Sequence, residues 1–496
     1  KNTSFRLKDR KGADFMLAPT AEEVITHFAR NATTSYRDLP ITFWQMSPKF
    51  RDEMSPKQGL VRGREFVMKD AYSFGTNPEE MRRAYDEMEE AYRRIFTRCG
   101  FNFIEVEADS GSIGGSGSAE FMAVTDFGED VLLHCPSCNY GGNQEKTIAY
   151  FPPYADEPLQ DLQEISTPDV KTVKALEEFV GLPSSKMAKT IILLADGKPV
   201  VVTMRGDLEI SEFKLGKLLG ADNVETADAE TVERVTGAPV GFAGPIGLYG
   251  KTGVQYFFDS SVEGLRNFLC GANKQGLHHI NVNSGRDFPA IDQYHDLSKA
   301  VAGQLCPSCK ANHLVEKRGI ELGHIFQLQK VYSDPMRATF VSAQGEELPY
   351  WMGCYGVGVS RIVQAIVEQQ YDARGILWPA TLAPYQACVI SVTTARLPDA
   401  EHLYKELQKA GIRVLLDDRD LRIGEKFTDA ELLGWPLQVV VGRAWETDQK
   451  LEVRLRDERN LANSRFSITK EGSLPTALMS LSEFLAYCTE TLRETT

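Results

Sequence analysis

Two arginine-bearing stretches decide how this chain is interpreted: FRDE at 50–53, continued by RGREFVMKD at 62–70, and MGCYGVGVSR at 352–361. Inside the first stretch, aromatic and apolar residues flank the turn-like segment SPKQG at 55–59. This pattern predicts a β-hairpin, and its period of two places Arg51 and Glu53 on one strand face. An ordinary hairpin with exposed charges would have the same pattern, so both interpretations stay open.

The second stretch predicts the start of a helix. Gly356 and Gly358 precede an apolar-periodic run, which favours a tight turn that opens a helix with Arg361 near its N-terminus. The helix dipole disfavours a cation there, so the arginine indicates a functional site, and helix N-termini also bind phosphate. A buried, glycine-rich packing turn is the alternative interpretation.

In this order, the two stretches resemble motifs 2 and 3 of the class II aminoacyl-tRNA synthetases, and the segments around them resemble the bacterial-type prolyl-tRNA synthetases. The resemblance implies a proline–tRNA ligase, which activates proline with ATP to prolyl-adenylate and transfers it to tRNA(Pro). Attack of a carboxylate on the α-phosphate of ATP brings two anions together, so the site needs fixed positive charge. The planar, permanently charged fork of arginine supplies this charge, and ATP implies Mg²⁺.

The resemblance also implies roles for residues at matching positions. Arg51 and Arg361 would be the catalytic residues, on the α- and γ-phosphates. The ATP site would comprise Arg51, Glu53, Arg62, Phe66, Gln327 and Arg361. The segments PTAEE at 19–23 and RGIELGHIFQL at 318–328, with motif 3, supply a proline site of Thr20, Glu22, His324 and Cys354. Thr20 and Glu23 also have the spacing of a helix capping box, which predicts a helix start with Thr20 as the N-cap.

An inserted region lies between about residues 152 and 304. An acidic, proline-containing linker leads into a self-contained α/β pattern with a helix at 171–181, strands at 190–195 and 199–204, and a helix at 211–219. It resembles the insertion domain of the same family, which is related to free-standing deacylases. A pocket for proline excludes the smaller alanine poorly, because missing methylenes are worth only about 1–3 kcal/mol. The implied editing site, which would hydrolyse Ala-tRNA(Pro), contains Lys189, Gly241, Gly244, Asp259 and His278. A solvated surface lysine is the alternative for Lys189, and the neighbouring His279 competes with His278.

Two CPSC segments, at 135–138 and 306–309, flank this insertion. If the insertion leaves and re-enters the core at one place, they predict a four-thiolate zinc site made of Cys135, Cys138, Cys306 and Cys309. Its role would be structural, because a complete four-cysteine shell leaves no open position on the metal. Four reduced thiols without a metal are the alternative.

The C-terminal region carries a further α/β pattern: a strand at 387–392, a helix at 399–410, a strand at 412–416, a helix after Gly424 and a strand at 438–442. This pattern resembles the class IIa anticodon-binding domain. Arg419 and Lys426 would contact RNA, with ordinary surface charge as the alternative for both.

Composition places the chain among soluble globular proteins. Its 496 residues are 42% hydrophobic and 25% charged, with no apolar run long enough for a membrane span and no visible signal peptide. Nine scattered cysteines indicate a reducing cytoplasm rather than a disulfide framework. The net charge of −14 makes local basic patches the expected RNA contacts. The chain opens at Lys1 without a match to motif 1, the dimerisation segment of the family, so a homodimer is expected when the N-terminus is complete.

The predicted fold class is a multidomain α/β and α+β chain. Residues 1–155 and 305–382 would form a class II synthetase antiparallel-sheet catalytic core, residues 156–304 an inserted α/β editing domain, and residues 383–496 an α/β anticodon-binding domain. Three rival functions are another class IIa synthetase, a synthetase-like protein that only senses tRNA, and an editing deacylase with a vestigial core. The insertion opposes the first rival, and the intact motif arginines oppose the other two.

Overall fold

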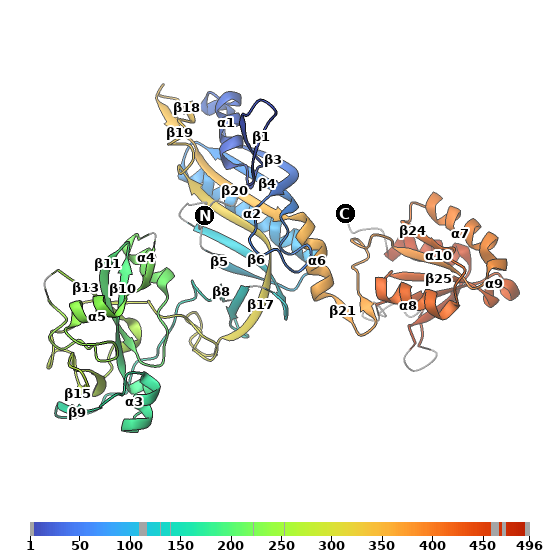
Figure 1. Ribbon diagram of the computed structural model, residues 1–496. Coiled ribbons are helices and arrows are strands. Elements are labelled where there is room, and N and C mark those ends of the chain that lie inside the picture. The colour runs from blue at the N-terminus through green and yellow to red at the C-terminus, as the bar shows by residue number, and fades with distance from the viewer. Residues whose placement is uncertain are drawn as a thin grey trace. The chain divides into compact units, whose positions relative to one another are not determined.

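The computed structural model describes residues 4–108, 117–128, 130–138, 140–221, 223–251, 253–457, 466–468 and 473–491 (Figure 1). The chain folds into two compact units. Unit 1 comprises Lys1–Ile104, Ser110–Gly128 and Gly319–Thr496, and unit 2 comprises Glu105–Asp109 and Glu129–Arg318. Both CPSC segments therefore belong to unit 2, whereas the predicted domain boundaries at 155, 304 and 382 stay predictions.

Unit 1 is built on an antiparallel sheet. Neighbouring strands follow the order β3 (Ile41–Phe50), β4 (Glu65–Gly75), β20 (Trp351–Gly358), β17 (Val315–Gln329), β6 (Gly117–Thr125) and β5 (Phe103–Ala108). The predicted hairpin is confirmed, since β3 pairs with β4 in a register that sets Phe50 opposite Glu65. Along β3, exposed residues alternate with less exposed ones, as the period of two requires of a strand with one solvated face.

Strand β20 corrects one expectation. The turn expected at Gly356 and Gly358 is wrong, because β20 pairs with β4 on one side and with β17 on the other and stays extended up to Gly358. Helix α6 (Val359–Gln369) then begins directly, with Arg361 in its first turn as predicted. The pairing of β4 with β20, which sets Met68 opposite Gly358, is what makes the two motif stretches neighbours.

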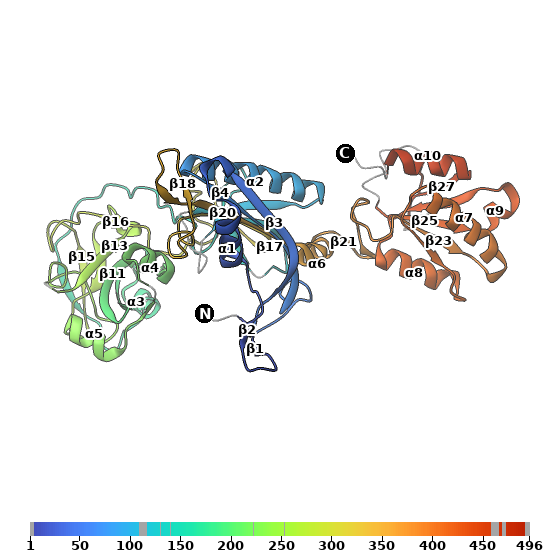
Figure 2. The same ribbon diagram turned by 90° about the horizontal axis from the view of Figure 1, so that it is seen from above.

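Besides α6, two helices accompany this sheet. Helix α2 (Pro78–Arg98) lies beside β4 and β20 (Figure 2), and the side chain of Asn77 caps it by accepting from the backbone N–H of Glu80 at 2.9 Å. Helix α1 (Glu22–Ala32) begins one residue later than predicted, with Ala21 as its N-cap. The capping-box prediction is wrong, because the Thr20 hydroxyl donates to the carboxylate of Glu22 and caps no backbone N–H.

The other elements of the core are short antiparallel pairs. These are β1 (Arg6–Lys8) with β2 (Asp14–Met16), β18 (Thr339–Val341) with β19 (Glu347–Pro349), and β21 (Tyr371–Asp372) with β22 (Gly375–Ile376).

The C-terminal part of unit 1 has its own sheet, in the order β24 (Val414–Asp417), β23 (Ala387–Ser391), β25 (Leu437–Val441), β26 (Leu451–Leu455) and β27 (Thr476–Met479). Its helices are α7 (Leu397–Lys409), α8 (Ile423–Leu433), α9 (Arg443–Asp448) and α10 (Leu481–Thr491). The predicted strands and helices are all present. The expected surface position of Lys426 is wrong, because this side chain is buried and donates to the carbonyl oxygens of Ser391 and Asp417. Arg419 is half-exposed and paired with Asp417 and Asp429.

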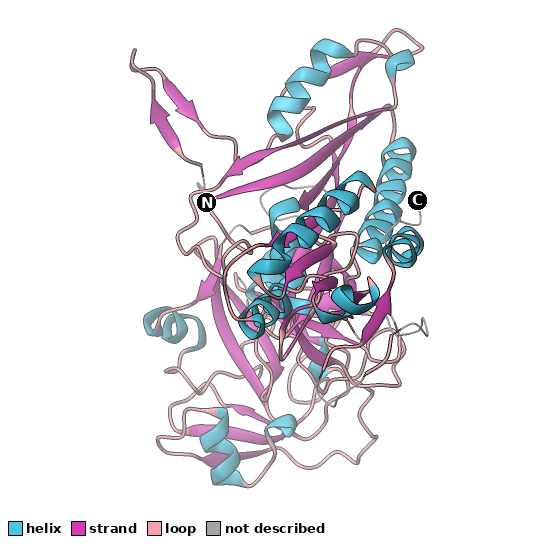
Figure 3. Cartoon of the chain, turned by 90° about the vertical axis from the view of Figure 1, so that its right-hand side faces the viewer, coloured by secondary structure: helices cyan, strands magenta, loops and turns pink. Residues whose placement is uncertain are grey.

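Unit 2, like unit 1, contains both helices and strands, and Figure 3 colours the helices of the chain cyan and its strands magenta. One sheet has the order β12 (Val224–Thr226), β10 (Ala188–Ala195), β11 (Lys198–Arg205), β13 (Gln255–Asp259) and β16 (Tyr294–His295), and a second has β14 (Phe268–Gly271), β15 (Leu277–Val282) and β9 (Gln163–Ser166). Helices α3 (Val173–Val180), α4 (Glu212–Leu219) and α5 (Ala229–Thr236) accompany them, and β7 (Asp130–His134) pairs with β8 (Gly141–Asn143). All predicted elements of the insertion are present.

Among the described residues, no helix is both long enough and apolar enough to cross a membrane. The cytoplasmic location stays a prediction.

Candidate active site

The motif residues converge on one cavity in unit 1. It has a volume of about 190 Å³ and lies between the β3–β4 hairpin, β17, β20 and the first turn of α6. Its walls contain these predicted residues: Thr20, Glu22, Arg51, Glu53, Arg62, Phe66, His324, Cys354 and Arg361. Gln327 is not among the lining residues, and its side-chain amide lies beside Gly117 of β6. Its contact with ATP therefore stays a prediction.

The two motif arginines, Arg51 and Arg361, line this cavity. Arg51 follows β3, and its guanidinium carbon lies 5.1 Å from the ring centroid of Phe66, while its Nε donates to the carbonyl oxygen of Pro19 at 3.2 Å. Arg361 donates from Nε to the carbonyl oxygen of Val61 at 2.8 Å. Because their neighbours hold both guanidinium groups in place, they are preorganised for oxyanions.

An arginine–glutamate pair fixes the loop that joins β3 to β4. Arg62 donates to a carboxylate oxygen of Glu53 from Nη2 at 2.9 Å and from Nε at 3.0 Å. Arg64 donates to the carbonyl oxygen of Glu53 at 3.1 Å. This framework leaves the flat ring of Phe66 in the cavity wall, where an aromatic base can stack.

Glu22 contributes a carboxylate to the wall of the same cavity. It is 2% exposed and accepts a hydrogen bond from the hydroxyl of Thr20. In the part of the chain that the structure describes, no lysine or arginine forms an ion pair with it. An ionised carboxylate buried without a cation is costly, so the geometry favours a ligand that brings a positive charge.

His324 lies between two carboxylates that the sequence analysis missed. Its Nδ1 is 3.3 Å from Oε1 of Glu120 and 3.5 Å from Oε1 of Glu321, and its ring stacks on Phe326 with centroids 3.8 Å apart. Burial by itself would raise the pKa of Glu321, but the hydrogen bond from His324 and the charge of Arg361 lower that pKa well below its usual range. Carboxylate oxygens such as these are ligands of hard cations, and the position of Glu321 inside the GIELGHIF segment was the signal that could have found it.

Cys354 is buried in the same cavity beside Glu22. Burial and then the negative charge of Glu22 raise the pKa of its thiol well above the usual range, so it is a pocket wall and not a nucleophile. Asp70 and Tyr72 also line the cavity and were missed. The period of two along β4, which carries Phe66 to Met68, Asp70 and Tyr72, could have indicated them.

A second cavity, of about 250 Å³, lies in unit 2. Of the predicted editing residues, it is lined by Lys189, Gly241 and His278. The rest of its wall is largely apolar or small, and its described lining residues include no carboxylate.

His278 is held as a neutral ring at the base of this second cavity. It is 3% exposed, and its Nδ1 lies 2.6 Å from the hydroxyl of Thr167. Burial lowers the pKa of His278 to about 4. Burial also lowers the pKa of Lys189, against the charges of nearby carboxylates. His279 lies on the other face of β15, 3.5 Å from Glu164, so only His278 of the two lines the cavity.

Two of the predicted glycines, Gly241 and Gly244, lie in close contact with the backbone of other segments. Gly241 has a φ of +102°, and a Cβ there would lie 2.7 Å from the carbonyl oxygen of Lys171. Gly244 does not line the cavity. A Cβ on Gly244 would lie 1.9 Å from the carbonyl oxygen of Gly271, so it sets how closely the loop packs on β14.

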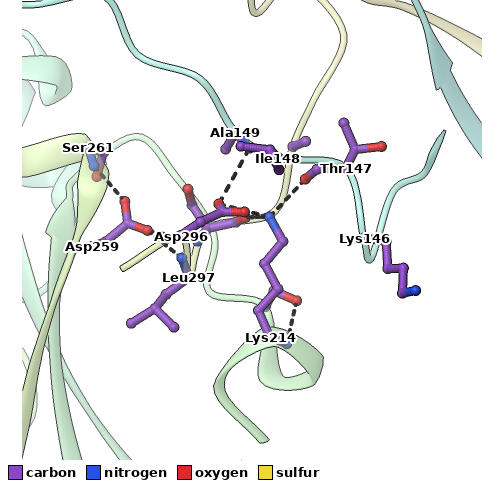
Figure 4. A network of polar contacts seen from close by, with 12 residues as sticks. Lys146, Thr147, Ile148, Ala149, Lys214, Asp259, Ser261, Asp296 and Leu297 are labelled. Carbon is purple, nitrogen blue, oxygen red and sulfur yellow. Dashed lines mark hydrogen bonds and ion pairs between the residues drawn. The ribbon is translucent and has the colours of Figure 1, made fainter. Parts of the chain in front are cut away.

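The structure does not bring Asp259 to this cavity. Its carboxylate is fully buried and accepts from the backbone N–H groups of residues 261, 297 and 298 at 2.8–2.9 Å (Figure 4). Three backbone donors satisfy the carboxylate and Asp259 does not line the cavity, so its role in editing stays a prediction.

A buried lysine completes this network. Nζ of Lys214 on α4 donates to Asp296 at 2.9 Å and to the carbonyl oxygens of Thr147 and Ser298 at 2.8 and 2.7 Å (Figure 4). The contacts fasten α4 to the two segments that enter and leave the insertion.

The four predicted metal ligands meet within unit 2. Sγ of Cys135 is 3.7 Å from Sγ of Cys309, Sγ of Cys138 is 3.7 Å from Sγ of Cys306, and all four sulfur atoms lie within 4.8 Å of one another. A tetrahedral zinc with bonds of about 2.3 Å places its sulfurs about 3.8 Å apart. Backbone N–H groups of residues 311 and 312 lower the pKa of Cys309, which favours a thiolate. The donor set thus fits a four-thiolate zinc ion.

Two protein-family models match the chain, one over each of two consecutive regions. Residues 5–370 match the family described as tRNA synthetase class II core domain (G, H, P, S and T). Residues 386–473 match the family described as anticodon binding domain.

Individual relatives are similar over most of the chain. A proline–tRNA ligase of Geobacter metallireducens is 48% identical over 459 residues, which cover 91% of this chain and 79% of the relative. One from Thermoanaerobacter sp. is 44% identical over 468 residues, or 93% of this chain and 81% of the relative. Among solved structures, a prolyl-tRNA synthetase from Cryptosporidium parvum, complexed with L-proline and AMP, matches with a TM-score of 0.52 at 12% identity. That match covers 99% of this chain and 62% of the solved chain, and at this identity it shows the fold alone.

Proposed function

The chain belongs to the proline–tRNA ligases, class II synthetases that join proline to tRNA with ATP, and from this premise we propose which of its residues do the work. The cavity of unit 1 is the activation site. One observation carries the proposal, namely that a buried carboxylate, Glu22, lines the same cavity as the two motif arginines, Arg51 and Arg361.

Each of these charged groups suits one part of the reaction. Glu22 binds the secondary ammonium of proline and Thr20 orients it, while His324 and Cys354 form the wall around the ring. Arg51 neutralises the α-phosphate as the proline carboxylate attacks it, and Arg361 holds the γ-phosphate of the leaving pyrophosphate. Phe66 stacks on adenine, and Glu53, held by Arg62, accepts from its amino group. Catalysis is positioning and charge neutralisation, so no nucleophilic side chain is needed.

Mg²⁺ accompanies ATP in this proposal, and Glu120 and Glu321 are the residues that would hold it. The ion supplies further neutralisation of the phosphates. The support is that both carboxylates approach the same nitrogen of His324 next to Arg361.

Proline-dependent exchange of pyrophosphate into ATP tests the assignment, with alanine and threonine as parallel substrates. We expect strong exchange with proline, weak exchange with alanine and none with threonine. Absence of exchange with proline, from protein that still binds tRNA, would favour a tRNA-sensing or deacylase function.

The cavity of unit 2 is proposed as an editing site for Ala-tRNA(Pro). The small residues of its wall suit a short side chain, Lys189 suits the phosphodiester end of the tRNA, and neutral His278 donates or accepts a hydrogen bond at the ester. Hydrolysis of Ala-tRNA(Pro) should fall in Lys189→Ala. Lys198→Ala, which changes an exposed lysine at the far end of the same sheet, is the matched control. Equal hydrolysis by all three proteins would refute the editing assignment.

The four cysteines are proposed to hold a structural zinc ion. Metal analysis of protein purified under reducing conditions, without added zinc, should find about one equivalent, and Cys306→Ser should lose it. Far less than one equivalent in the unaltered protein would leave four reduced thiols as the interpretation.

Two macromolecular partners complete the proposal. The 386–473 region binds the anticodon of tRNA(Pro). A second copy of the chain binds unit 1, which exposes Trp44 (68%) and Met46 (58%) on the edge strand β3. The mass in solution of Trp44→Glu should shift toward the monomer, and an unchanged mass would move the interface elsewhere.

A further inference from the structure

Asp70 lies at the centre of a buried network beside the proposed proline pocket. Its Oδ1 accepts from the ammonium of Lys49 at 2.8 Å, and its Oδ2 accepts from the amide of Gln45 at 2.8 Å and from the hydroxyl of Tyr72 at 2.7 Å. The side chains of Lys49 and Asp70 are 1% and 5% exposed. The lysine therefore neutralises Asp70, whereas Glu22 in the same cavity has no such cation among the described residues.

This network fixes the direction of the Tyr72 hydroxyl. An ionised carboxylate only accepts, so the single proton of Tyr72 is committed to Asp70. Burial, followed by the charges of Glu22 and Asp70, raises the pKa of Tyr72 well above its usual range, so the proton stays on the oxygen. Toward the cavity, which Tyr72 lines, its oxygen can then only accept.

The cavity thus offers two acceptors to a cation, the carboxylate of Glu22 and the oxygen of Tyr72. The ring nitrogen of proline carries two N–H groups in its cationic form, and each needs an acceptor when buried. We propose that Tyr72, set as an acceptor by the Lys49–Asp70 pair, takes the second N–H of the prolinium nitrogen and is a specificity-determining residue for this secondary ammonium. The inference rests on the proposed assignment of the proline pocket to Glu22.

Tyr72→Phe removes the acceptor and keeps the ring. We expect the KM for proline in pyrophosphate exchange to rise about 10- to 100-fold, as for loss of a charge-assisted hydrogen bond, with the KM for ATP unchanged. N-methyl-L-proline has one N–H in its cationic form, so its inhibition constant should change less than threefold. Tyr350→Phe is the matched control, because it deletes a buried hydroxyl bonded to Thr33 outside the cavity.

A change in the KM for proline of less than threefold, or an equal loss for both ligands, would overturn the inference. A Glu22→Gln variant shows whether only the role of Tyr72 is wrong or the assignment of the whole proline pocket is wrong. If Glu22→Gln loses proline activation while Tyr72→Phe does not, the pocket stands and only the role of Tyr72 falls. If Glu22→Gln still activates proline, the assignment of the proline pocket is wrong.

Asp70→Asn gives a second test should Tyr72→Phe not fold. Lys49 can only donate, so it holds the amide oxygen of the new side chain and turns the NH₂ group toward Tyr72 and Gln45, whose own amide turns over to present its oxygen. The hydroxyl of Tyr72 must then point its proton into the cavity, against the prolinium N–H. We expect a larger rise in the KM for proline than in Tyr72→Phe, and a KM near that of the unaltered protein would contradict the inference.

Discussion

The cavities of unit 1 and unit 2 differ in charge more than in size. The first is lined by buried Glu22 and by Arg51 and Arg361, whereas the second is lined by two lysines and a neutral His278, with no carboxylate among its described lining residues. Joining a carboxylate to a phosphate requires fixed positive charge, and binding a cationic amine requires a carboxylate. Recognition of a small acyl group on tRNA requires a close pocket, with cations only where the tRNA phosphates lie. The contrast therefore separates a site that works by electrostatics from one proposed to work by fit.

The largest expected effect tests whether the two sites are independent. Arg51→Ala should lower the kcat of proline-dependent exchange by about 10²–10³-fold, because a preorganised charge on the reacting phosphate is lost. Lys189→Ala should leave this exchange unchanged. Equal losses in both variants would mean that the two cavities act as one site.

A smaller effect sharpens the boundary of the second site. Asp259→Asn places an NH₂ group against backbone donors, so unit 2 should lose about 2–3 kcal/mol of stability. Ala-tRNA(Pro) hydrolysis per folded molecule should stay unchanged. Chemical denaturation followed by a probe in unit 2 measures the first quantity. Normal stability with lost hydrolysis would return Asp259 to the catalytic machinery.

The smallest expected effect concerns pH. The pKa of His278 is about 4 in the folded protein, below the ordinary value of about 6.5, so the unfolded chain binds the proton more readily. The stability from neutral His278 is complete above about pH 6.5. It should fall by about 1.4 kcal/mol as the pH drops from there to about 5.5.

Peptide-resolved hydrogen exchange over β15, corrected for intrinsic rates, measures this loss in the full chain. His278→Gln, which does not titrate, should flatten the dependence. An equally steep dependence in that variant would assign the titration to another group.

Much of the fold followed from local patterns. The β3–β4 hairpin and the strands and helices of the insertion came from turn residues and periodicity. The errors at Gly356 and at Thr20 arose where a distant strand or a nearby carboxylate competed with the local signal, and the error at Lys426 arose because no local pattern shows that this side chain is buried.

The site was predicted less evenly. Residues named by the motifs do converge on the first cavity. Asp70 and Tyr72 share the strand period of Phe66 and could have been found from it, but Glu120 carries no mark in the sequence that separates it from ordinary strand residues. Asp259 had the residue type of a catalytic group and proved to be a buried acceptor for backbone N–H groups.

The sequence by itself determined the order of elements, the two motif arginines and the four cysteines, because turns, caps and strand periods act between residues close along the chain. Only the tertiary structure decided which charges are neutralised. Lys49 pairs with Asp70, while buried Glu22 has no cationic partner among the described residues. Such pairing depends on burial and on distances of a few ångströms between segments far apart in sequence, and no local pattern encodes either.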